Sequence, residues 1–261
     1  MTFQNVFITG ASSGLGRGLA LHYANAGSTV FAAARRREQL ETLVSEVKGA
    51  GKVVPVALDV VDLEALEAAI KAAEAQSGGH LDLVIANAGT NAPTHGLSMD
   101  WRRVKSILDL NVTAAITTIA AALPAMVARG SGTVVGVSSL AAYRGLPGNG
   151  AYSASKAALA TFLESLRVDL RGSGVRALCI YPGFVKTELT ARHEGKTPMP
   201  FLMELEDAVE VMSRGIGRGE ARIVFPLAMA ATVKLAAALP NGVYAALAGM
   251  SPKPKKRAAK E

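Results

Sequence analysis

The order of apolar runs and helix-patterned segments restricts the fold of this chain more than any other feature. Short apolar runs alternate with longer segments in which apolar residues recur at helical spacing. Such alternation predicts right-handed strand–helix–strand crossovers and a mostly parallel sheet covered by helices on both faces. We therefore expect a single doubly wound α/β domain with a seven-stranded sheet, whose strands lie in residues 6–10, 28–35, 53–59, 81–89, 132–139, 175–183 and 221–226.

Helices are expected between these strands. The first follows a glycine turn and runs through Ala26, and the next two cover 38–50 and 63–76. A long helical stretch over 98–129 is expected to be interrupted near Asp109–Asn111. In an open parallel sheet, ligands bind beyond the carboxyl ends of the strands, so chemistry-bearing residues are sought there.

Length and charge narrow the class of protein. The 261 residues, half of them hydrophobic, suffice for one sizeable core. We expect one domain over 1–250 and a basic, flexible tail over 251–261. Five basic residues and one acid in 253–261 account for more than half of the net charge of +7. The remaining body does not indicate nucleic-acid binding.

Cysteine usage and the first residues bear on compartment. Cys179 is the only cysteine, which excludes a disulfide framework and a cysteine-based metal site. Its apolar surroundings in the run VRALCIYP favour a buried structural thiol. The chain enters an apolar strand at once and leaves no room for a secretion signal. We expect a cytoplasmic protein without a metal site.

The first strand ends in TGASSGLG, residues 9–16, directly before the first helix. Gly10 permits a tight turn, Gly14 allows close approach of a pyrophosphate, and Gly16 allows close packing of helix on sheet. Free N–H groups at the helix N-terminus suit phosphates. The turn lacks the GK[ST] ending of a nucleoside triphosphatase loop. It indicates a dinucleotide site.

The end of the second strand bears on which dinucleotide binds. An acid there would hold a ribose 2′-hydroxyl, but the sequence places Arg35, Arg36 and Arg37 there. Arg35, with Arg36 or Ser12, suits a 2′-phosphate. Three arginines also oppose the dipole at a helix N-terminus, so a solvated helix start explains them less well. We expect NADP(H) as the cofactor.

Tyr152 and Lys156 lie four residues apart in a segment patterned as a helix, so both side chains can face one place. A cation about 4 Å from a phenol lowers the pKa of the phenol from about 10 toward neutrality. Such a phenol can serve as a general acid or base. Chance pairs of this spacing are common enough that the pair alone is weak evidence.

Taken in order, these motifs resemble those of the short-chain dehydrogenase/reductase family over residues 3–190. The matching features are TGASSGLG, Asp59, Asn87-Ala88-Gly89, Asn111, Ser139, the Tyr152/Lys156 pair and Pro182-Gly183. The resemblance implies a Rossmann-type fold and a catalytic tetrad of Asn111, Ser139, Tyr152 and Lys156. In that tetrad Asn111 orients a water linked to Lys156, Ser139 holds the substrate oxygen, and Lys156 also grips the nicotinamide ribose.

The resemblance also implies a set of cofactor contacts, with Asp59 on the adenine and Thr187 on the carboxamide. The expected cofactor-binding residues are Gly10, Ser12, Ser13, Gly14, Leu15, Gly16, Arg35, Arg36, Asp59, Val60, Asn87, Ala88, Gly89, Tyr152, Lys156, Pro182, Gly183, Val185 and Thr187.

The substrate is less defined by sequence. The expected pocket walls are Leu140, Tyr143, Leu146, Asn149 and Phe184, with a lid over 188–205; this mostly apolar set suits a hydrophobic carbonyl compound or secondary alcohol. The apolar helix expected at 227–239 is too short to span a bilayer. It is a core or subunit-interface helix, a wall of the pocket, or an anchor at a membrane surface.

Two functions of different classes remain. The first is an NADP(H)-dependent oxidoreductase, a carbonyl reductase or alcohol dehydrogenase, that acts on a small molecule. The second is a non-catalytic NADP-binding regulator on the same fold, which would not need an intact tetrad. We expect a homodimer or homotetramer in either case, because a lone subunit would leave the apolar C-terminal helix in water.

Overall fold

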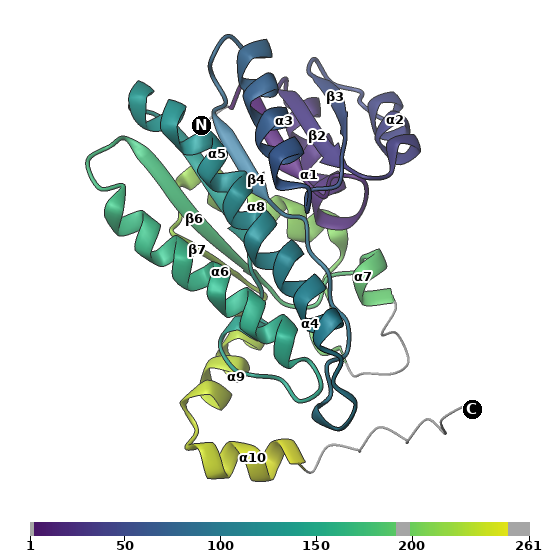
Figure 1. Cartoon of the computed structure of the whole chain (residues 1–261), viewed down its shortest axis with the longest axis vertical. Coiled ribbons are helices and arrows are strands. Elements are labelled where there is room, and N and C mark those ends of the chain that lie inside the picture. The colour runs from purple at the N-terminus through teal and green to yellow at the C-terminus, as the bar shows by residue number, and fades with distance from the viewer. Residues whose placement is uncertain (1–2, 192–198, 250–261) are drawn as a thin grey trace.

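The structure is a computed structural model that describes residues 3–191 and 199–249. Seven parallel strands form one sheet in the order β3-β2-β1-β4-β5-β6-β7 (Figure 1). The strands are β1 (Asn5–Thr9), β2 (Thr29–Ala34), β3 (Lys52–Ala57), β4 (Leu83–Ala86), β5 (Gly132–Val137), β6 (Val175–Pro182) and β7 (Arg222–Phe225). The expected seven-stranded, doubly wound fold is confirmed, and the sheet is parallel throughout.

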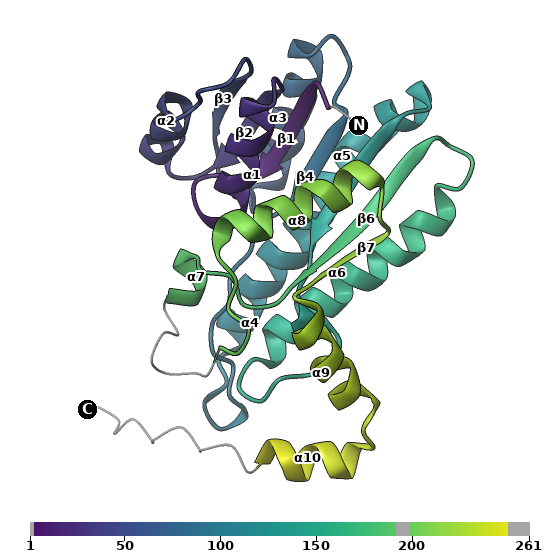
Figure 2. The same ribbon diagram turned by 180° about the vertical axis from the view of Figure 1, so that it is seen from behind.

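Helices cover both faces of the sheet, as Figures 1 and 2 show from opposite sides. One face carries α1 (Gly14–Asn25), α2 (Arg37–Ser45) and α8 (Leu205–Arg218), and the other carries α3 (Leu63–Gln76), α4 (Trp101–Leu108), α5 (Ala115–Arg129) and α6 (Gly150–Asp169). Side chains alternate between two cores: Val6 and Ile8 face one, and Phe7 faces the other. This alternation is what a strand buried on both faces requires.

The strand order reverses between β1 and β4, the neighbours at the centre of the sheet. From β1 the chain winds outward through β2 to β3, and from β4 it winds the other way to β7. The connections that follow β1 and β4 therefore diverge and leave a crevice at the carboxyl ends of these strands. The fold places the candidate site there.

The long helix expected over 98–129 begins after a short turn, η1 (Gly96–Ser98), and is interrupted as predicted. A π-helical segment, η2 (Asp109–Ala114), separates α4 from α5. Within the described residues, Trp101–Arg129 is the one stretch long and apolar enough to cross a membrane by length and composition. Its buried residues, including Ile119, Ala122 and Met126, belong to the core against the sheet. A helix that covers a sheet in this way meets the same length and hydropathy criteria as a membrane span.

Two helices differ from those expected. The helix expected over 38–50 ends at Ser45, because Asn25 Oδ1 accepts hydrogen bonds from the backbone N–H groups of Lys48 (2.8 Å) and Gly49 (2.9 Å) and holds them as a loop. The second difference is α8, a helix that follows the expected lid and was not predicted. Its buried residues, Ala208, Val209, Met212, Gly215 and Ile216, recur at helical spacing.

The C-terminal part forms two further helices, α9 (Leu227–Ala238) and α10 (Asn241–Gly249). They extend away from the sheet at the lower end of the molecule in both views (Figures 1 and 2). Ala230 is the one fully buried residue that α9 contributes to the core. The predicted tail over 251–261 and the central part of the predicted lid, 192–198, lie outside the described residues; α7 (Glu188–Ala191) covers the start of the lid.

Candidate active site

A cavity of about 880 Å³ opens at the carboxyl ends of the central strands. Its wall is formed by the glycine turn, the ends of β2, β4, β5 and β6, the first turns of α6, and α9. Eighteen of the nineteen predicted cofactor-binding residues line it: Gly10, Ser12, Ser13, Gly14, Leu15, Arg35, Arg36, Asp59, Val60, Asn87, Ala88, Gly89, Tyr152, Lys156, Pro182, Gly183, Val185 and Thr187. Segments that lie up to 177 positions apart in the sequence thus share one wall.

Gly16 is the predicted cofactor residue that does not line the cavity. A Cβ atom built on Gly16 would lie 2.4 Å from both Asn87 Nδ2 and the carbonyl oxygen of Gly10. Such distances are far inside van der Waals contact, so glycine is required for α1 to pack this closely on the sheet. Gly16 therefore shapes the site from beneath, as expected of a close-packing position, and is not a contact residue.

The turn itself is fixed by glycine conformation and by a threonine. Gly10 has φ +70°, and a Cβ there would lie 2.8 Å from Ala88 Cα. Thr9 Oγ1 accepts hydrogen bonds from the backbone N–H groups of Asn87 and Ala88, each at 3.1 Å. Asn87 Nδ2 donates to the carbonyl oxygen of Thr9 at 3.0 Å. Thr9, which sequence reasoning missed, ties the loops after β1 and β4 together; its place as the first residue of the glycine motif was the available signal.

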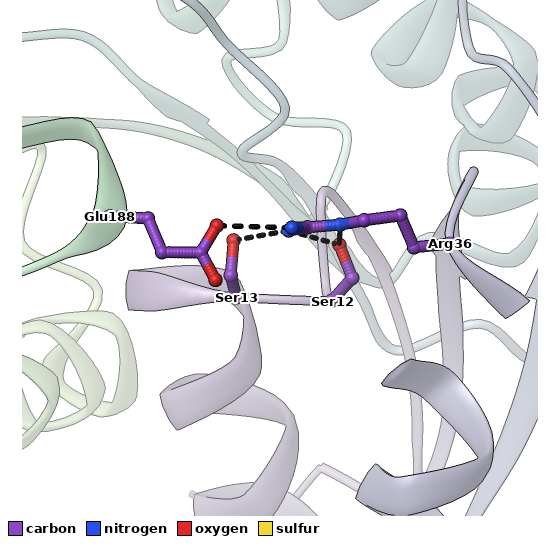
Figure 3. A network of polar contacts seen from close by, with 4 residues as sticks. All are labelled: Ser12, Ser13, Arg36 and Glu188. Atoms are coloured by element: carbon purple, nitrogen blue, oxygen red, sulfur yellow. Dashed lines mark hydrogen bonds and ion pairs between the residues drawn. The ribbon is translucent and has the colours of Figure 1, made fainter. Parts of the chain in front are cut away.

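The arginines after β2 separate into two roles (Figure 3). Arg36 donates from Nη2 to the hydroxyls of Ser13 (2.8 Å) and Ser12 (3.1 Å), and from Nη1 to Glu188 Oε2 (3.1 Å). Arg35 is 74% exposed and lies 3.6 Å from Asp59 Oδ2. Arg36 is therefore the cation positioned over the glycine turn. The expectation gave Arg35 the leading place, and the structure places Arg36 there.

Asn111 lies in the π-helical segment η2 and is completely buried. Its amide forms hydrogen bonds to both backbone groups of Thr90: Oδ1 accepts from N–H at 2.8 Å, and Nδ2 donates to the carbonyl oxygen at 2.9 Å. Nδ2 also donates to Ser155 Oγ at 3.0 Å. A Cβ on Gly89 would lie 3.3 Å from both Asn111 Oδ1 and Lys156 Nζ. Asn111 thus lies behind the cavity wall, close to Lys156, and joins η2 to the loop after β4 and to α6.

Ser139 and its neighbour Ser138 differ in what they contact. Ser138 is buried and donates to the backbone carbonyl of Lys156 at 2.7 Å, which fastens β5 to α6. Ser139 precedes the short turn η3 (Leu140–Ala142), and its Oγ accepts from Ala141 N–H at 3.1 Å. The Ser139 side chain lies close enough to the Tyr152 phenol to lower the pKa of that phenol. Ser139 is therefore the serine that faces the phenol, as the spacing to Tyr152 predicted.

Tyr152 and Lys156 lie together on α6, with Lys156 Nζ 5.8 Å from the centre of the Tyr152 ring. Lys156 is buried and donates to the carbonyl oxygen of Val137 at 2.8 Å. Burial lowers the pKa of Lys156 to about 8. Burial also raises the pKa of Tyr152, and the neighbouring Ser139 side chain lowers it only in part. The expected fall in the Tyr152 pKa is thus wrong for this structure, because burial disfavours the charged forms of both groups.

The far end of the cavity is apolar. Leu140, Leu146, Asn149 and Phe184 line it as predicted, and Met199, Met229 and Val233 extend the same wall. One face of α9 therefore lines the cavity, which agrees with the pocket-wall reading among the three given for the apolar C-terminal helix.

Tyr143, predicted as a substrate residue, does not line this cavity. The turn η3 directs Leu140 into the cavity and Tyr143 away from it. Tyr143 stacks on Tyr181, with ring centres 5.3 Å apart and planes at 28°. It lines a second, smaller cavity that includes Arg222 and Lys234.

The described residues contain no group of three or more His, Cys, Asp or Glu side chains placed to hold a metal ion. Cys179 is buried, and burial raises the pKa of its thiol to about 11. A thiol in this state is a poor nucleophile. Ser139, Tyr152 and Lys156 all line the cavity and stay the predicted catalytic residues.

Comparison with known families identifies the chain. The short chain dehydrogenase family matches residues 4–197, most of the chain and all four tetrad positions. This chain belongs to the short-chain dehydrogenase/reductase family and is an oxidoreductase of the kind that uses a nicotinamide cofactor.

Particular relatives extend the match beyond residue 197. A Myxococcus xanthus protein named "Uncharacterized oxidoreductase" is 55% identical over 249 residues, 95% of this chain and 97% of that protein. A protein of Chromohalobacter salexigens named "Sulfoacetaldehyde reductase" is 38% identical over 73% of this chain and 76% of its own. A short-chain dehydrogenase from Sphingobium yanoikuyae in complex with NADPH is 26% identical and superimposes with a TM-score of 0.79 over 98% of both chains. A dehydrogenase from Streptomyces avermitilis gives a TM-score of 0.80 at 26% identity, covering 95% of this chain and 96% of its own.

Proposed function

We propose that this protein is an NADP(H)-dependent oxidoreductase that transfers a hydride between nicotinamide and the carbonyl or secondary alcohol of a hydrophobic small molecule. The observation that carries the proposal is the composition of one cavity wall. A glycine turn with an arginine over it forms one end, Ser139, Tyr152 and Lys156 lie along it, and apolar side chains form the other end. In this arrangement a dinucleotide would bind from the glycine turn to Tyr152, and a small substrate would bind against the apolar side chains.

The preference for the 2′-phosphorylated cofactor is inferred from Arg36. Its guanidinium and the hydroxyls of Ser12 and Ser13 lie together at the turn, and the residue after β2 that would be an acid in an NAD site is Arg35. A phosphate accepts several charge-assisted hydrogen bonds from such a set. The relative from Sphingobium yanoikuyae, whose structure contains NADPH, supports the same choice.

When bound, the cofactor supplies or accepts the hydride, and the residues of this chain supply everything else. Tyr152 donates a proton to the carbonyl oxygen during reduction and removes it during oxidation. Ser139, whose side chain lies beside that phenol, holds the substrate oxygen. Lys156 lies beneath the Tyr152 ring, where its ammonium can hold ribose hydroxyls and stabilise a phenolate after proton transfer.

The pKa directions of Tyr152 and Lys156 suit the proton donation that a reduction requires at neutral pH. The raised pKa keeps the Tyr152 phenol protonated, which is the form that a general acid requires. Lys156, with a pKa near 8, is mostly protonated below that pH and can support the proton donor. Asn111 acts through position: its amide holds the Thr90 backbone and Ser155, and so fixes the first turns of α6.

The apolar end of the cavity defines the substrate class. Leu140, Leu146, Phe184, Met229 and Val233 present hydrocarbon to a bound molecule, and Asn149 is the polar exception. Such a wall suits an aldehyde or ketone with an apolar body. We also propose a homodimer or homotetramer in the cytoplasm, as expected from the sequence.

A non-catalytic NADP-binding regulator is the competing function. It would use the glycine turn and Arg36, but it would not need Ser139, Tyr152 and Lys156 at one wall. The two functions are separated by a screen of ketones, aldehydes and alcohols in which nicotinamide absorbance is followed. Oxidation of NADPH with at least one carbonyl compound is expected; tight NADPH binding without turnover of any compound would favour the regulator.

Cofactor choice is tested by titrating NADPH and NADH into the unmodified protein and the Arg36→Ala and Arg35→Ala variants. Removal of charge-assisted hydrogen bonds worth about 1.5–3 kcal/mol should weaken NADPH binding about 10- to 100-fold in Arg36→Ala. NADH binding should change little. The more exposed Arg35 should have the smaller effect. Equal loss of both cofactors would show that Arg36 supports the fold instead.

A further inference from the structure

Large apolar side chains are exposed at the end of the molecule that holds the substrate part of the cavity. In the segment before and at the start of α4, Leu97 is 89% exposed, Met99 59% and Trp101 63%. On the C-terminal helices, Leu235 is 70% and Leu247 56% exposed. α9, α10 and the start of α4 lie at the same lower end in both Figures 1 and 2. Large apolar side chains left exposed at one end of a molecule indicate an interaction surface.

Hydrogen bonds to the loop between η3 and α6 hold both segments in place. The backbone N–H of Thr94 donates to the carbonyl oxygen of Gly148 at 2.7 Å, which ties the segment before α4 to this loop. Arg144 donates to the carbonyl oxygen of Ala237 (3.3 Å) and to Asn241 Oδ1 (3.0 Å) at the joint between α9 and α10.

A second fastening comes from Tyr244 on α10. Its hydroxyl donates to the carbonyl oxygen of Gly145 at 2.6 Å, and the Arg144 guanidinium lies 4.3 Å from its ring centre. The two helices are therefore held to the body by specific polar contacts while their leucines face outward. A helix pair that is held in a fixed orientation and exposes apolar side chains can serve as a docking surface.

Charge indicates which partner covers this surface. Residues 227–249 include one charged side chain, Lys234, and no acid, and 253–261 carry five basic residues and one acid. Arg102 lies 4.7 Å from the Trp101 ring centre at the start of α4. Exposed leucines, a tryptophan and nearby cations are the composition of surfaces that bind anionic lipid.

We propose that this end, defined by Leu97, Met99, Trp101, α9 and α10, docks on the surface of an anionic lipid bilayer. The other face of α9 forms part of the cavity wall through Met229 and Val233. Docking therefore places the apolar end of the cavity beside the lipid. Resting on the proposed function, the inference names the substrate class as carbonyl compounds or alcohols that partition into a membrane.

The test is sedimentation of the full chain with phosphatidylcholine vesicles, with or without phosphatidylglycerol. The protein is expected to bind the phosphatidylglycerol vesicles and to bind less in high salt, because salt screens the cations. The double variant Leu235→Glu/Leu247→Glu should lower the partition coefficient at least about tenfold. The matched control is Val44→Glu/Val168→Glu, which alters exposed valines on α2 and at the far end of α6 and should bind as the unmodified protein does.

Three results would overturn the docking proposal. They are absence of binding to phosphatidylglycerol vesicles, equal loss in the control variant, and a dimer that Leu235→Glu/Leu247→Glu dissociates in protein that does not bind vesicles. The last result would assign the surface to a second copy. Circular dichroism melting confirms that each variant folds. Turnover of a water-soluble ketone without vesicles is measured separately, so loss of the proposed oxidoreductase function and loss of docking are distinguished.

Discussion

Arg36 binds the carboxylate of Glu188 at the place where the proposed function puts the 2′-phosphate of the cofactor. Its Nη1 donates to Glu188 at 3.1 Å, while Nη2 donates to Ser12 and Ser13 (Figure 3). Glu188 also lines the cavity and begins α7, directly after Thr187. A phosphate at this place would compete with the carboxylate for the guanidinium and repel it.

Glu188→Gln is therefore expected to tighten NADPH binding and leave NADH binding unchanged. A half-exposed ion pair contributes about 0.2–1 kcal/mol, so the gain in affinity is about 1.5- to 5-fold. Fluorescence titration of both cofactors measures it. Glu41→Gln is the matched control, because Glu41 pairs with Arg37 on the same helix and lies outside the cavity wall. Weaker NADPH binding in Glu188→Gln would contradict this account of the ion pair.

Lys156 gives the protein a stability term that depends on pH. Its pKa is about 8 in the folded chain and near 10.5 when unfolded, so between these values the unfolded chain binds more protons. Raising the pH through this window therefore stabilises the fold relative to Lys156→Met, which has no such titration. Urea unfolding should show the difference growing by about 2 kcal/mol from pH about 8 to about 10. If the stability difference between the two proteins did not change with pH, the pKa of Lys156 would not be lowered by folding.

The helices around the cavity determine where its functional side chains lie. The glycine turn permits α1 to begin against the sheet, η2 places Asn111 behind the wall, and α6 carries Tyr152 and Lys156 on one face. α9 closes the apolar end. Each element contributes through its ends or one face, where free backbone groups and directed side chains meet the cavity.

The close approach of α1 to the sheet is tested by Gly16→Ala. The new Cβ would lie 2.4 Å from Asn87 Nδ2, and overpacking of this kind costs about 1–3 kcal/mol. Thermal unfolding and NADPH titration should both show a loss, because Asn87 and the turn are displaced together. In the control, Gly217→Ala, a Cβ on α8 meets nothing within 4 Å, so stability should be equal or higher by up to about 1 kcal/mol. Equal stability of the two variants would contradict the packing role of Gly16.

Sequence reasoning succeeded where pattern and conformation coincide. Seven apolar runs predicted seven strands because a parallel strand buried on both faces is apolar throughout. Glycine positions such as Gly10 were recognisable because only glycine adopts that backbone easily. No helix was expected at α8, although its buried residues recur at helical spacing. Residues 205–218 combine apolar residues at helical spacing, which favour a helix, with two glycines, which favour a loop.

At the scale of the whole molecule, the site gathers residues from position 10 to position 233. Parallel strands make this possible, because all of their carboxyl ends meet at one edge. The topology follows from the order of elements and predicts a site at this edge, and the family resemblance placed Asn87 and Tyr152 in it beside the glycine turn. Side-chain direction could not be: Tyr143 is three residues after Leu140 yet faces a different cavity. Sequence spacing also could not show that Arg36, and not Arg35, contacts the glycine turn, because this depends on the direction of each side chain.

The central claim is that Tyr152 is the proton donor of an NADPH-dependent reduction at this wall. Tyr152→Phe removes the phenol oxygen and leaves the ring beside Lys156, so NADPH should bind nearly as before. Without the positioned acid, turnover should fall about 100-fold or more. Tyr143→Phe is the matched control, because its hydroxyl is buried with no hydrogen-bond partner among the described residues and its ring faces the second cavity.

The most direct measurement is the rate of NADPH oxidation with a carbonyl substrate in the unmodified protein, Tyr152→Phe and Tyr143→Phe. The account predicts near-complete loss of turnover in Tyr152→Phe, with NADPH affinity retained, and near-normal turnover in Tyr143→Phe. Turnover in Tyr152→Phe close to that of the unmodified protein would contradict it.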